Sequence, residues 1–315
     1  MRSLNFESQK NEIINISKGL LTDGTVKVVL AYADSSIYGN AAPRFFRKAE
    51  ELDSMKWDET CTPSLAKYLL EKSGKIAIVA KPCDARAIVM YMVEKQIDRE
   101  NVYIIGIECA GMAGDNGAPA AGCGECRVRV PPVYDALIKH SDVSESLSEK
   151  EYIDKNAENI GLGLEESQEQ SLEKNFEQRL ERFQKEMKKC MLCFTCRQAC
   201  YGCYCKTCFI DRNIPDWSPA DIEMGTKMAF HLGRAMHLAG RCVECGACER
   251  VCPSGVKVRY LIKEITGLCK ELYGYSAGMD TGEIPLIAAF DTGDREVGFL
   301  GGEDDEAYCD PKKQD

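Results

Sequence analysis

Two runs of cysteines with identical spacing lie between residues 190 and 252. Each run follows the pattern C-x2-C-x2-C-x3-C, and Pro253 comes directly after the second run. Bacterial proteins use this spacing to hold 4Fe–4S clusters, which transfer single electrons, through cysteine thiolates. The runs comprise Cys190, Cys193, Cys196 and Cys200, and then Cys242, Cys245, Cys248 and Cys252.

The last cysteine of each run is expected to bind the cluster of the other run. A two-residue gap lets one tight loop turn three thiolates toward one cluster, and the fourth cysteine lies about one helical turn further along. The spacing therefore predicts one cluster on Cys190, Cys193, Cys196 and Cys252, and another on Cys242, Cys245, Cys248 and Cys200. The alternative is a pair of structural zinc knuckles, because C-x2-C pairs also bind zinc.

Further cysteines follow the strands of a predicted parallel sheet. Apolar, β-branched runs at 26–32, 76–80 and 102–107 predict buried strands, and a helix is predicted over 85–95. The carboxyl ends of parallel strands meet at one edge of a sheet, where open α/β sheets bind their ligands. A glycine-rich loop at 111–122 is expected to bring two more cysteines to that edge. We therefore predict a third 4Fe–4S cluster on Cys83, Cys109, Cys123 and Cys126.

This third site has an alternative explanation. Cys83 and Cys109 can be small core residues, and Cys123 and Cys126 a redox-active dithiol. Three nearby cations can offset the negative charge of a cluster or be ordinary surface residues; they are Lys81, Arg86 and Arg127. An additional run can bind a fourth cluster, replace a ligand of the first cluster or alter its surroundings; it comprises Cys203, Cys205 and Cys208.

Helices are predicted around these cysteines. Apolar residues recur at helical spacing over 171–187, so an amphipathic helix should lead into the first run. Further helices are expected over 217–238 and 256–272, where His231 should lie on a helix face. In the first half of the chain, proline near a first turn indicates a helix over 62–70. Asp84 is expected to cap the helix that follows the second strand.

Composition excludes several classes of function. The chain has 315 residues, 18 cysteines and a formal net charge of −10, which argues against nucleic-acid binding because phosphates attract a basic face. No stretch approaches the ~20 apolar residues of a membrane span, and the N-terminus has no apolar signal-peptide core. Metal-bound thiolates in a reducing cytoplasm therefore explain the cysteines better than disulfides do.

The predicted fold is α/β, with a parallel sheet followed by a mostly helical, expanded two-cluster ferredoxin-like domain. Residues 1–140 are expected to form the α/β domain with the third cluster, and the polar segment 141–172 a linker. Residues 173–275 are expected to form the ferredoxin-like domain. Residues 276–315 are expected to be an acidic tail, whose apolar island at 284–290 docks on this chain or on a partner.

A combination of motifs resembles one protein family. The motifs are Lys81-Pro82-Cys83-Asp84-x-Arg86, Gly106-Ile107-x-Cys109-x-Gly111, the run from Cys193 to Cys208, and Gly240-Arg241-Cys242 to Pro253 followed by Tyr273-Gly274-Tyr275-x-Ala277-Gly278. Together, across most of 76–280, they resemble the iron–sulfur β subunits of formate dehydrogenases and deazaflavin-reducing hydrogenases. More loosely, they are similar to the iron–sulfur subunits of anaerobic sulfite reductase and sulfhydrogenase. The resemblance implies a subunit that moves electrons between partner subunits in an anaerobe, and some such subunits also bind a flavin and reduce a deazaflavin coenzyme.

The sequence therefore favours an electron-transfer subunit of a multi-subunit oxidoreductase of formate dehydrogenase, hydrogenase or heterodisulfide-reductase type. No catalytic triad or paired carboxylates are evident, and electron hops between clusters need no acid–base residue. One alternative is an FAD-bearing reductase that acts on a deazaflavin or nicotinamide at the sheet edge, although the chain lacks a Gly-x-Gly-x-x-Gly fingerprint. A more remote alternative is a non-redox scaffold stabilised by zinc.

Overall fold

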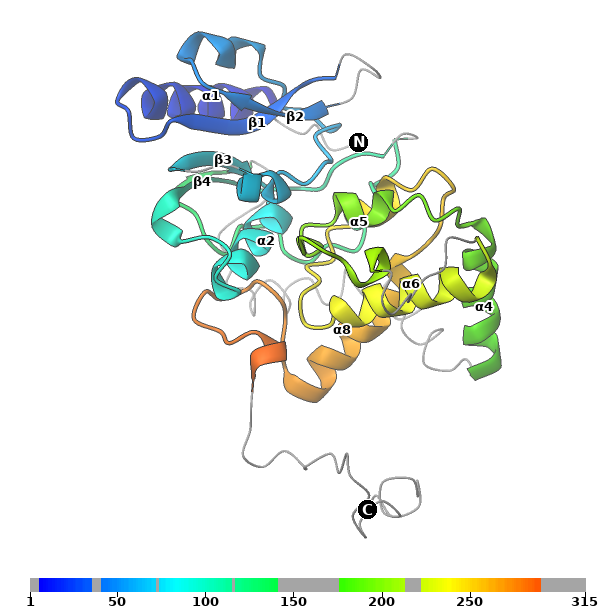
Figure 1. The fold of residues 1–315 in the computed structure, drawn as a ribbon. Helices are drawn as coiled ribbons and strands as arrows, with labels where there is room; N and C mark the ends of the chain where they lie inside the picture. The colour runs from blue at the N-terminus through cyan, green and yellow to red at the C-terminus, as the bar shows by residue number, and fades with distance from the viewer. Residues whose placement is uncertain are drawn as a thin grey trace, which may run out of the picture.

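The computed structural model describes residues 6–35, 41–71, 74–114, 117–140, 176–212 and 222–289. Its first half is built around a five-stranded sheet in the order β2-β1-β3-β4-β5 (Figure 1). The strands are β1 (Val28–Asp34), β2 (Ala41–Phe46), β3 (Ile76–Ala80), β4 (Val102–Ile107) and β5 (Ala136–Ile138). Only the pairing of β1 with β2 is antiparallel, so the α/β class and the mostly parallel sheet predicted from the sequence are confirmed.

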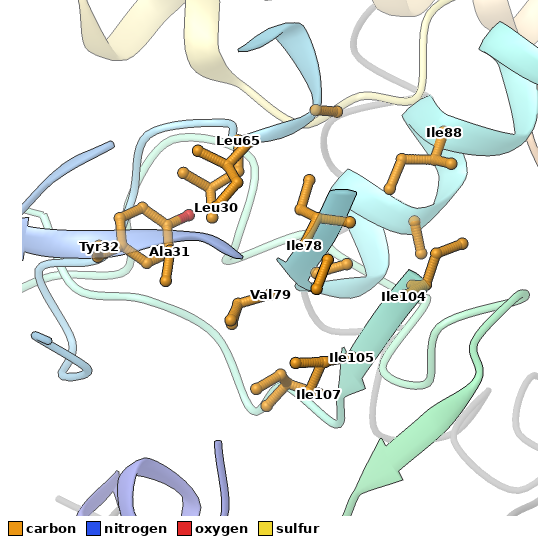
Figure 2. Close-up of a cluster of buried hydrophobic side chains, with 14 of the residues drawn as sticks. Leu30, Ala31, Tyr32, Leu65, Ile78, Val79, Ile88, Ile104, Ile105 and Ile107 are labelled. Carbon is orange, nitrogen blue, oxygen red and sulfur yellow. The ribbon is translucent and has the colours of Figure 1, made fainter. Parts of the chain in front are cut away.

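Helices cover the sheet because its strands are apolar on both faces. All five residues of β3 are buried between α1 (Phe6–Thr22) and α2 (Pro82–Val93). Figure 2 shows Ile78 and Ile104 on the face toward Ile88 of α2, whereas Val79 and Ile105 point to the opposite face. The connection β3–α2–β4 joins parallel strands, so the carboxyl ends of β3 and β4 reach the same edge.

The segment before β3 differs from its prediction. The sequence predicts an α-helix over 62–70, but the chain forms a 3₁₀ helix, η2 (Ala66–Glu71). The predicted capping role of Asp84 is wrong as well, because Asp84 lies inside the first turn of α2 and Lys81 occupies the cap position. The Asp84 carboxylate instead accepts hydrogen bonds from Ser64 Oγ at 2.8 Å and Leu65 N at 3.0 Å. This tertiary contact ties the segment just before η2 to the first turn of α2.

The described residues from 176 onward form a helical part. Its helices are α4 (Phe176–Lys189), α5 (Thr195–Ala199), α6 (Met224–His237), α7 (Ala247–Arg250) and α8 (Arg259–Tyr273). It also contains the 3₁₀ turns η4 (Phe209–Asp211) and η5 (Leu286–Ala288), whereas η1 (Ala49–Ser54) and η3 (Arg99–Asn101) lie in the first half of the chain. The predicted linker 141–172 and the predicted helix start at 217–221 lie outside the described residues. None of the helices that the structure describes is long and apolar enough to cross a membrane.

The sheet part (described residues within 6–140) and the helical part (within 176–289) pack directly on each other. Arg86 of α2 is buried and donates from Nε and Nη2 to Ala277 O at 3.0 and 2.8 Å, and from Nη1 to Val243 O at 3.3 Å. A Cβ added at Gly278 would lie 2.3 Å from Arg86 O, so the backbones meet where only glycine fits. The division into domains at the boundaries named above stays a prediction.

Candidate metal centres

Two cavities in the helical part collect the cysteines of the two runs. The first cavity, with an empty volume of about 350 Å³ that is partly open to solvent, is lined by Cys190, Cys193, Cys196 and Cys252. The second cavity, of about 430 Å³, is lined by Cys200, Cys242, Cys245 and Cys248. The structure therefore brings together the two crossed sets that the spacing predicted.

The two cysteine loops share one backbone geometry. Leu192 and Glu244, each two residues after the first cysteine of its run, adopt left-handed φ angles of +54° and +56°. Their N–H groups donate to Cys190 Sγ and Cys242 Sγ, both at 3.4 Å. Non-glycine residues rarely adopt this conformation, and such strain persists where the surrounding structure demands it. The repeated turn is what directs successive cysteines into one cavity.

Each loop continues into a short helix that carries the fourth cysteine away. Phe194 and Gly246, with φ angles of +57° and +73°, cap α5 and α7. The two short helices pack against each other. Cys200, after α5, therefore reaches the second cavity, and Cys252, beyond α7, reaches the first.

The chemistry of these thiols fits a metal cluster. Burial raises the pKa of Cys190, Cys196, Cys242 and Cys248, and that of Cys245 to about 11. Buried thiols of this kind become thiolate ligands by releasing protons to solvent when metal binds. Four cysteines around one cavity match a 4Fe–4S cluster, which takes one thiolate per iron. Among the residues that the structure describes, no group of three or more His, Cys, Asp or Glu side chains is arranged closely enough to hold a metal ion.

The four cysteines predicted for the third site lie at the same edge of the sheet. Cys83 is in the first turn of α2, and Cys109 follows β4. A Cβ added at Gly111 would lie 3.8 Å from the Cβ of Cys123, and Cys126 N donates to Cys123 O at 3.3 Å. Burial raises the pKa of Cys83 and Cys126, and that of Cys109 to about 11. Cys109 interacts electrostatically with Cys83, Cys123 and Cys126, so the predicted set is spatially connected.

This sheet edge abuts the second cavity. Cys83 interacts electrostatically with Cys245, which lines that cavity. A Cβ added at Gly246 would lie 1.9 Å from Ala121 O, so two backbones touch between the cysteine sets. Arg250 fastens this contact, because its Nη1 donates to Ala121 O at 2.7 Å and to Cys245 O at 2.6 Å.

The three cations proposed for the third site have different surroundings. Lys81 is 3 % exposed, its Nζ lies 3.0 Å from Asp84 Oδ2, and it donates to the hydroxyl of Tyr32. Burial by itself would lower the Lys81 pKa, but Asp84 and Tyr32 raise it well above its usual value. Arg86 is bound to backbone oxygens of the helical part, and Arg127 is half-buried in the loop after Cys126. A role of these cations toward a cluster stays a prediction.

The additional cysteines do not gather at one cavity. The thiol of Cys203 hydrogen-bonds Cys200, and this bond lowers the Cys200 pKa below its usual value. Cys205 is exposed, and Cys208 interacts with Arg197 of α5. Neither cavity described above is lined by these three residues, so the structure places only Cys203 beside a predicted cluster.

The same segment contains an inter-part latch that the sequence did not reveal. Tyr91 Oη of α2 donates to Tyr201 O at 2.8 Å, and Tyr204 Oη donates to Glu94 Oε2 at 2.6 Å. Arg241, the residue before Cys242, donates from Nη2 to Glu94 Oε2 at 2.9 Å. We call Tyr91, Glu94, Tyr201, Tyr204 and Arg241 the latch. The partners in each of these hydrogen bonds are 110 or more residues apart in the sequence, so no local pattern could predict their contact.

Two residues of α6 contact the cysteine sets, and the sequence indicated only that one of them lies on a helix face. His231 is 4 % exposed, and its Nε2 lies 3.3 Å from Cys190 Sγ. Burial, and then the charge of Arg234, lower the His231 pKa to about 4, so its ring is neutral near pH 7. Arg234 is also 4 % exposed and donates from Nη2 to Cys196 O at 3.3 Å. Their spacing of three on a helix between two cysteine runs is the signal that could have identified the pair.

The largest described cavity is a cleft between the sheet part and the helical part. Its empty volume of about 1,440 Å³ includes open solvent. Residues of β2, the segments 62–68, 113–114 and 118–121, α5 and α7 line it, and its polar side chains include Ser64, Lys67, Gln198 and Arg250. Arg250 also donates to Cys245 O, so the cleft lies next to the second cavity.

Comparison with known proteins places this geometry in context. No family model matches the chain. The F420-dependent formate dehydrogenase subunit beta of Methanocaldococcus jannaschii is 24 % identical over 357 aligned residues, which cover 86 % of this chain and 92 % of that protein. The chain resembles formate dehydrogenase β subunits. The F420-dependent formate dehydrogenase 1 subunit beta of Methanococcus maripaludis is 37 % identical over 97 residues, or 30 % of this chain and 25 % of that protein.

The resemblance inferred from the cysteine motifs is therefore confirmed. The names of both relatives support a subunit of an oxidoreductase complex, and the cysteine content is compatible with iron–sulfur clusters. The number of clusters, a bound flavin and a hydrogenase-type assembly stay predictions.

Proposed function

We propose that this chain relays single electrons between partner subunits of an oxidoreductase complex through three 4Fe–4S clusters. The crossed arrangement carries the proposal, because each cavity is lined by three cysteines of one loop and the fourth of the other. A mononuclear zinc site has no need of such crossing. Partners of formate dehydrogenase, hydrogenase or heterodisulfide-reductase type and a cytoplasmic location belong to the same proposal.

Three observations support a relay order that runs from the sheet-edge cysteines through the second cavity to the first cavity. The cysteine set at the sheet edge adjoins the second cavity through Cys83 and Cys245. Arg234 contacts cysteines of the second and the first cavity. Cys193, at the first cavity, is the exposed member of its set. When bound, each cluster supplies a site that accepts or releases one electron, and the N–H groups on Cys109, Cys190, Cys242 and Cys252 sulfurs stabilise the added negative charge.

Iron and acid-labile sulfide per chain test the proposal, measured on anaerobically purified full-length protein with flavin assayed in the same sample. A three-cluster relay gives about twelve irons per chain. A value of about eight would retain the two crossed sites and remove the third. Zinc without iron or sulfide would overturn the relay and favour a scaffold.

A flavin-bearing reductase is the second candidate, and the cleft favours it. The cleft adjoins the second cavity, so a flavin there would lie next to a predicted cluster. Both relatives are named as F420-dependent, which suggests a deazaflavin coenzyme as the electron acceptor or donor. The segments 113–114 and 118–121, which line the cleft, consist of Ala, Gly and Pro, and these small side chains leave room for a flat ring against the backbone.

A variant that fills the cleft distinguishes the flavin-bearing reductase from the electron relay. Gln198 is exposed on α5 and lines the cleft, so Gln198→Trp should exclude a flavin without touching the cysteines. About one flavin per chain in the natural protein, lost in Gln198→Trp at unchanged iron content, would move the active site into this subunit. Natural protein that contains iron but no flavin would leave the relay as the function.

A further inference from the structure

Helix α6 presents a row of nitrogen groups to both cysteine cavities. Lys227, His231 and Arg234 occupy positions i, i+4 and i+7, which lie on one side of a helix. The helix lies in the insertion between the two cysteine runs. It packs against α4, which leads into the first run, and against α8.

The first two members of the row lie on the side of the first cavity, and of the two only His231 lines it. His231 lines that cavity, with Nε2 at 3.3 Å from Cys190 Sγ. Lys227 is half-buried one turn earlier and interacts electrostatically with the same thiol. Neither residue lines the second cavity.

Arg234 lies between the two cavities. It lines the second cavity together with Cys200 and Cys248 and donates from Nη2 to the backbone oxygen of Cys196, which lines the first. Its electrostatic partners are the thiols of Cys200, Cys248, Cys203 and Cys196.

The buried guanidinium of Arg234 is surrounded by thiols: it hydrogen-bonds the side chains of Cys200, Cys203 and Cys248 as well as the Cys196 carbonyl. Its Nε is buried with no hydrogen-bond partner, and in the described part of the chain no carboxylate forms an ion pair with it. A buried charge is costly unless an opposite charge lies close to it. The anionic clusters expected in the two cavities would supply that charge from both sides.

We infer that α6 sets the reduction potentials of the two crossed clusters, and that the positive charge of Arg234 acts on both clusters at once. The inference rests on the proposed function, because it requires clusters in both cavities. A fixed positive charge favours the reduced form of a nearby cluster, and the buried surroundings weaken the screening of that charge. Arg234 therefore raises both potentials and links them, whereas Lys227 and His231 act on the cluster of the first cavity.

A redox titration of full-length protein, followed by electron paramagnetic resonance, tests this inference. Arg234→Gln should lower both potentials, with about a tenfold smaller ratio of reduced to oxidised cluster at a fixed potential, or 59 mV for a one-electron couple. Arg234→Lys, which keeps the charge, should give smaller shifts. The matched control is Lys263→Gln, because Lys263 lines only the second cavity and is paired with Glu125 at 2.7 Å. This control should shift at most one cluster, and by less.

The possible outcomes distinguish a failure of the proposed function from a failure of the inference about α6. Natural protein that lacks iron in both cavities would overturn the proposed function itself. Natural protein with both clusters, and unchanged potentials or a shift at one cluster alone in Arg234→Gln, would overturn only the inference about α6. If Arg234→Gln loads no iron, Lys227→Gln decides: a lower potential at the first cluster alone supports the row, and no shift or equal shifts overturn it.

Discussion

Cys200 and Cys252 illustrate how the position of one residue decides which cluster it can bind. Both follow a short helix, and both leave the cavity of their own loop for the other. Cys200 is 8 % exposed, and Arg234 and the thiol of Cys203 lie beside it. A substitution at Cys200 should therefore damage the second cavity, although Cys200 belongs to the first run.

Cys200→Ala is predicted to remove the cluster of Cys242, Cys245 and Cys248 and to leave the other crossed cluster in place. Iron analysis should then show a loss of about four irons per chain, because one cubane is lost. Cys269→Ala is the control: Cys269 is buried on α8 but lines neither cavity, so iron content should not change. Loss of the cluster at Cys190 instead would contradict the crossing, and loss only in a Cys200→Ala/Cys203→Ala double variant would make Cys203 a replacement ligand.

At the scale of elements, the two cysteine loops are near copies that differ where they meet the sheet part. Phe194 and Gly246 occupy matching positions with left-handed backbones. The ring of Phe194 packs against the ring of Phe230, with 5.0 Å between the ring centroids, whereas the backbone of Ala121 lies against Gly246. The second loop therefore needs glycine because another chain segment occupies the space of a side chain.

Gly246→Ala is predicted to lower the free energy of unfolding by about 1–3 kcal/mol and to loosen the second cluster. The added methyl group must displace Ala121 O as well as adopt a positive φ angle. Gly255→Ala is a matched control, since Gly255 has a similar φ of +60° but nothing within 4 Å of an added Cβ. Denaturant unfolding and iron retention should show a larger effect for Gly246→Ala, and equal effects would mean that the close approach is not needed.

At the scale of the whole molecule, several side-chain contacts hold the sheet part on the helical part. Arg86 binds the segment around Ala277, Arg250 binds the backbone of Ala121, and the latch joins α2 to the cysteine-rich segment. Together they keep the sheet edge, with its four cysteines, against the second cavity. An electron relay across this boundary depends on that placement, because the two cysteine sets come from different parts of the chain.

Glu94→Gln is predicted to destabilise the protein by about 1–3 kcal/mol, because it leaves the half-buried Arg241 and Tyr204 with a neutral partner. The side chains of Arg241 and Glu94 are only 14 % and 9 % exposed. Asp53→Asn is the control, because Asp53 pairs with Lys18 while 69 % exposed and should change stability by about 0–1 kcal/mol. Denaturant unfolding gives both values, and equal effects would show that the latch is not a significant tie.

The sequence by itself determined the features whose chemistry is local. Three apolar runs predicted β1, β3 and β4, because a strand buried on both faces must be apolar throughout. The cysteine spacing predicted the crossed sets, because one helical turn carries the fourth thiol out of its own loop. The order of strand, helix and strand also predicted that Cys83 and Cys109 lie at one edge of the sheet.

Only the tertiary structure decided features that depend on distant segments. The bonds that Ser64 and Leu65 donate to Asp84 join the segment before η2 to α2, and β5 forms through its pairing with β4. The latch, the contact of Gly246 with Ala121, and the place of Arg234 between two cavities join residues with no periodic relation in sequence. Periodicity reports which face of an element is buried, but not what is packed against it, so these contacts had to be seen in the folded chain.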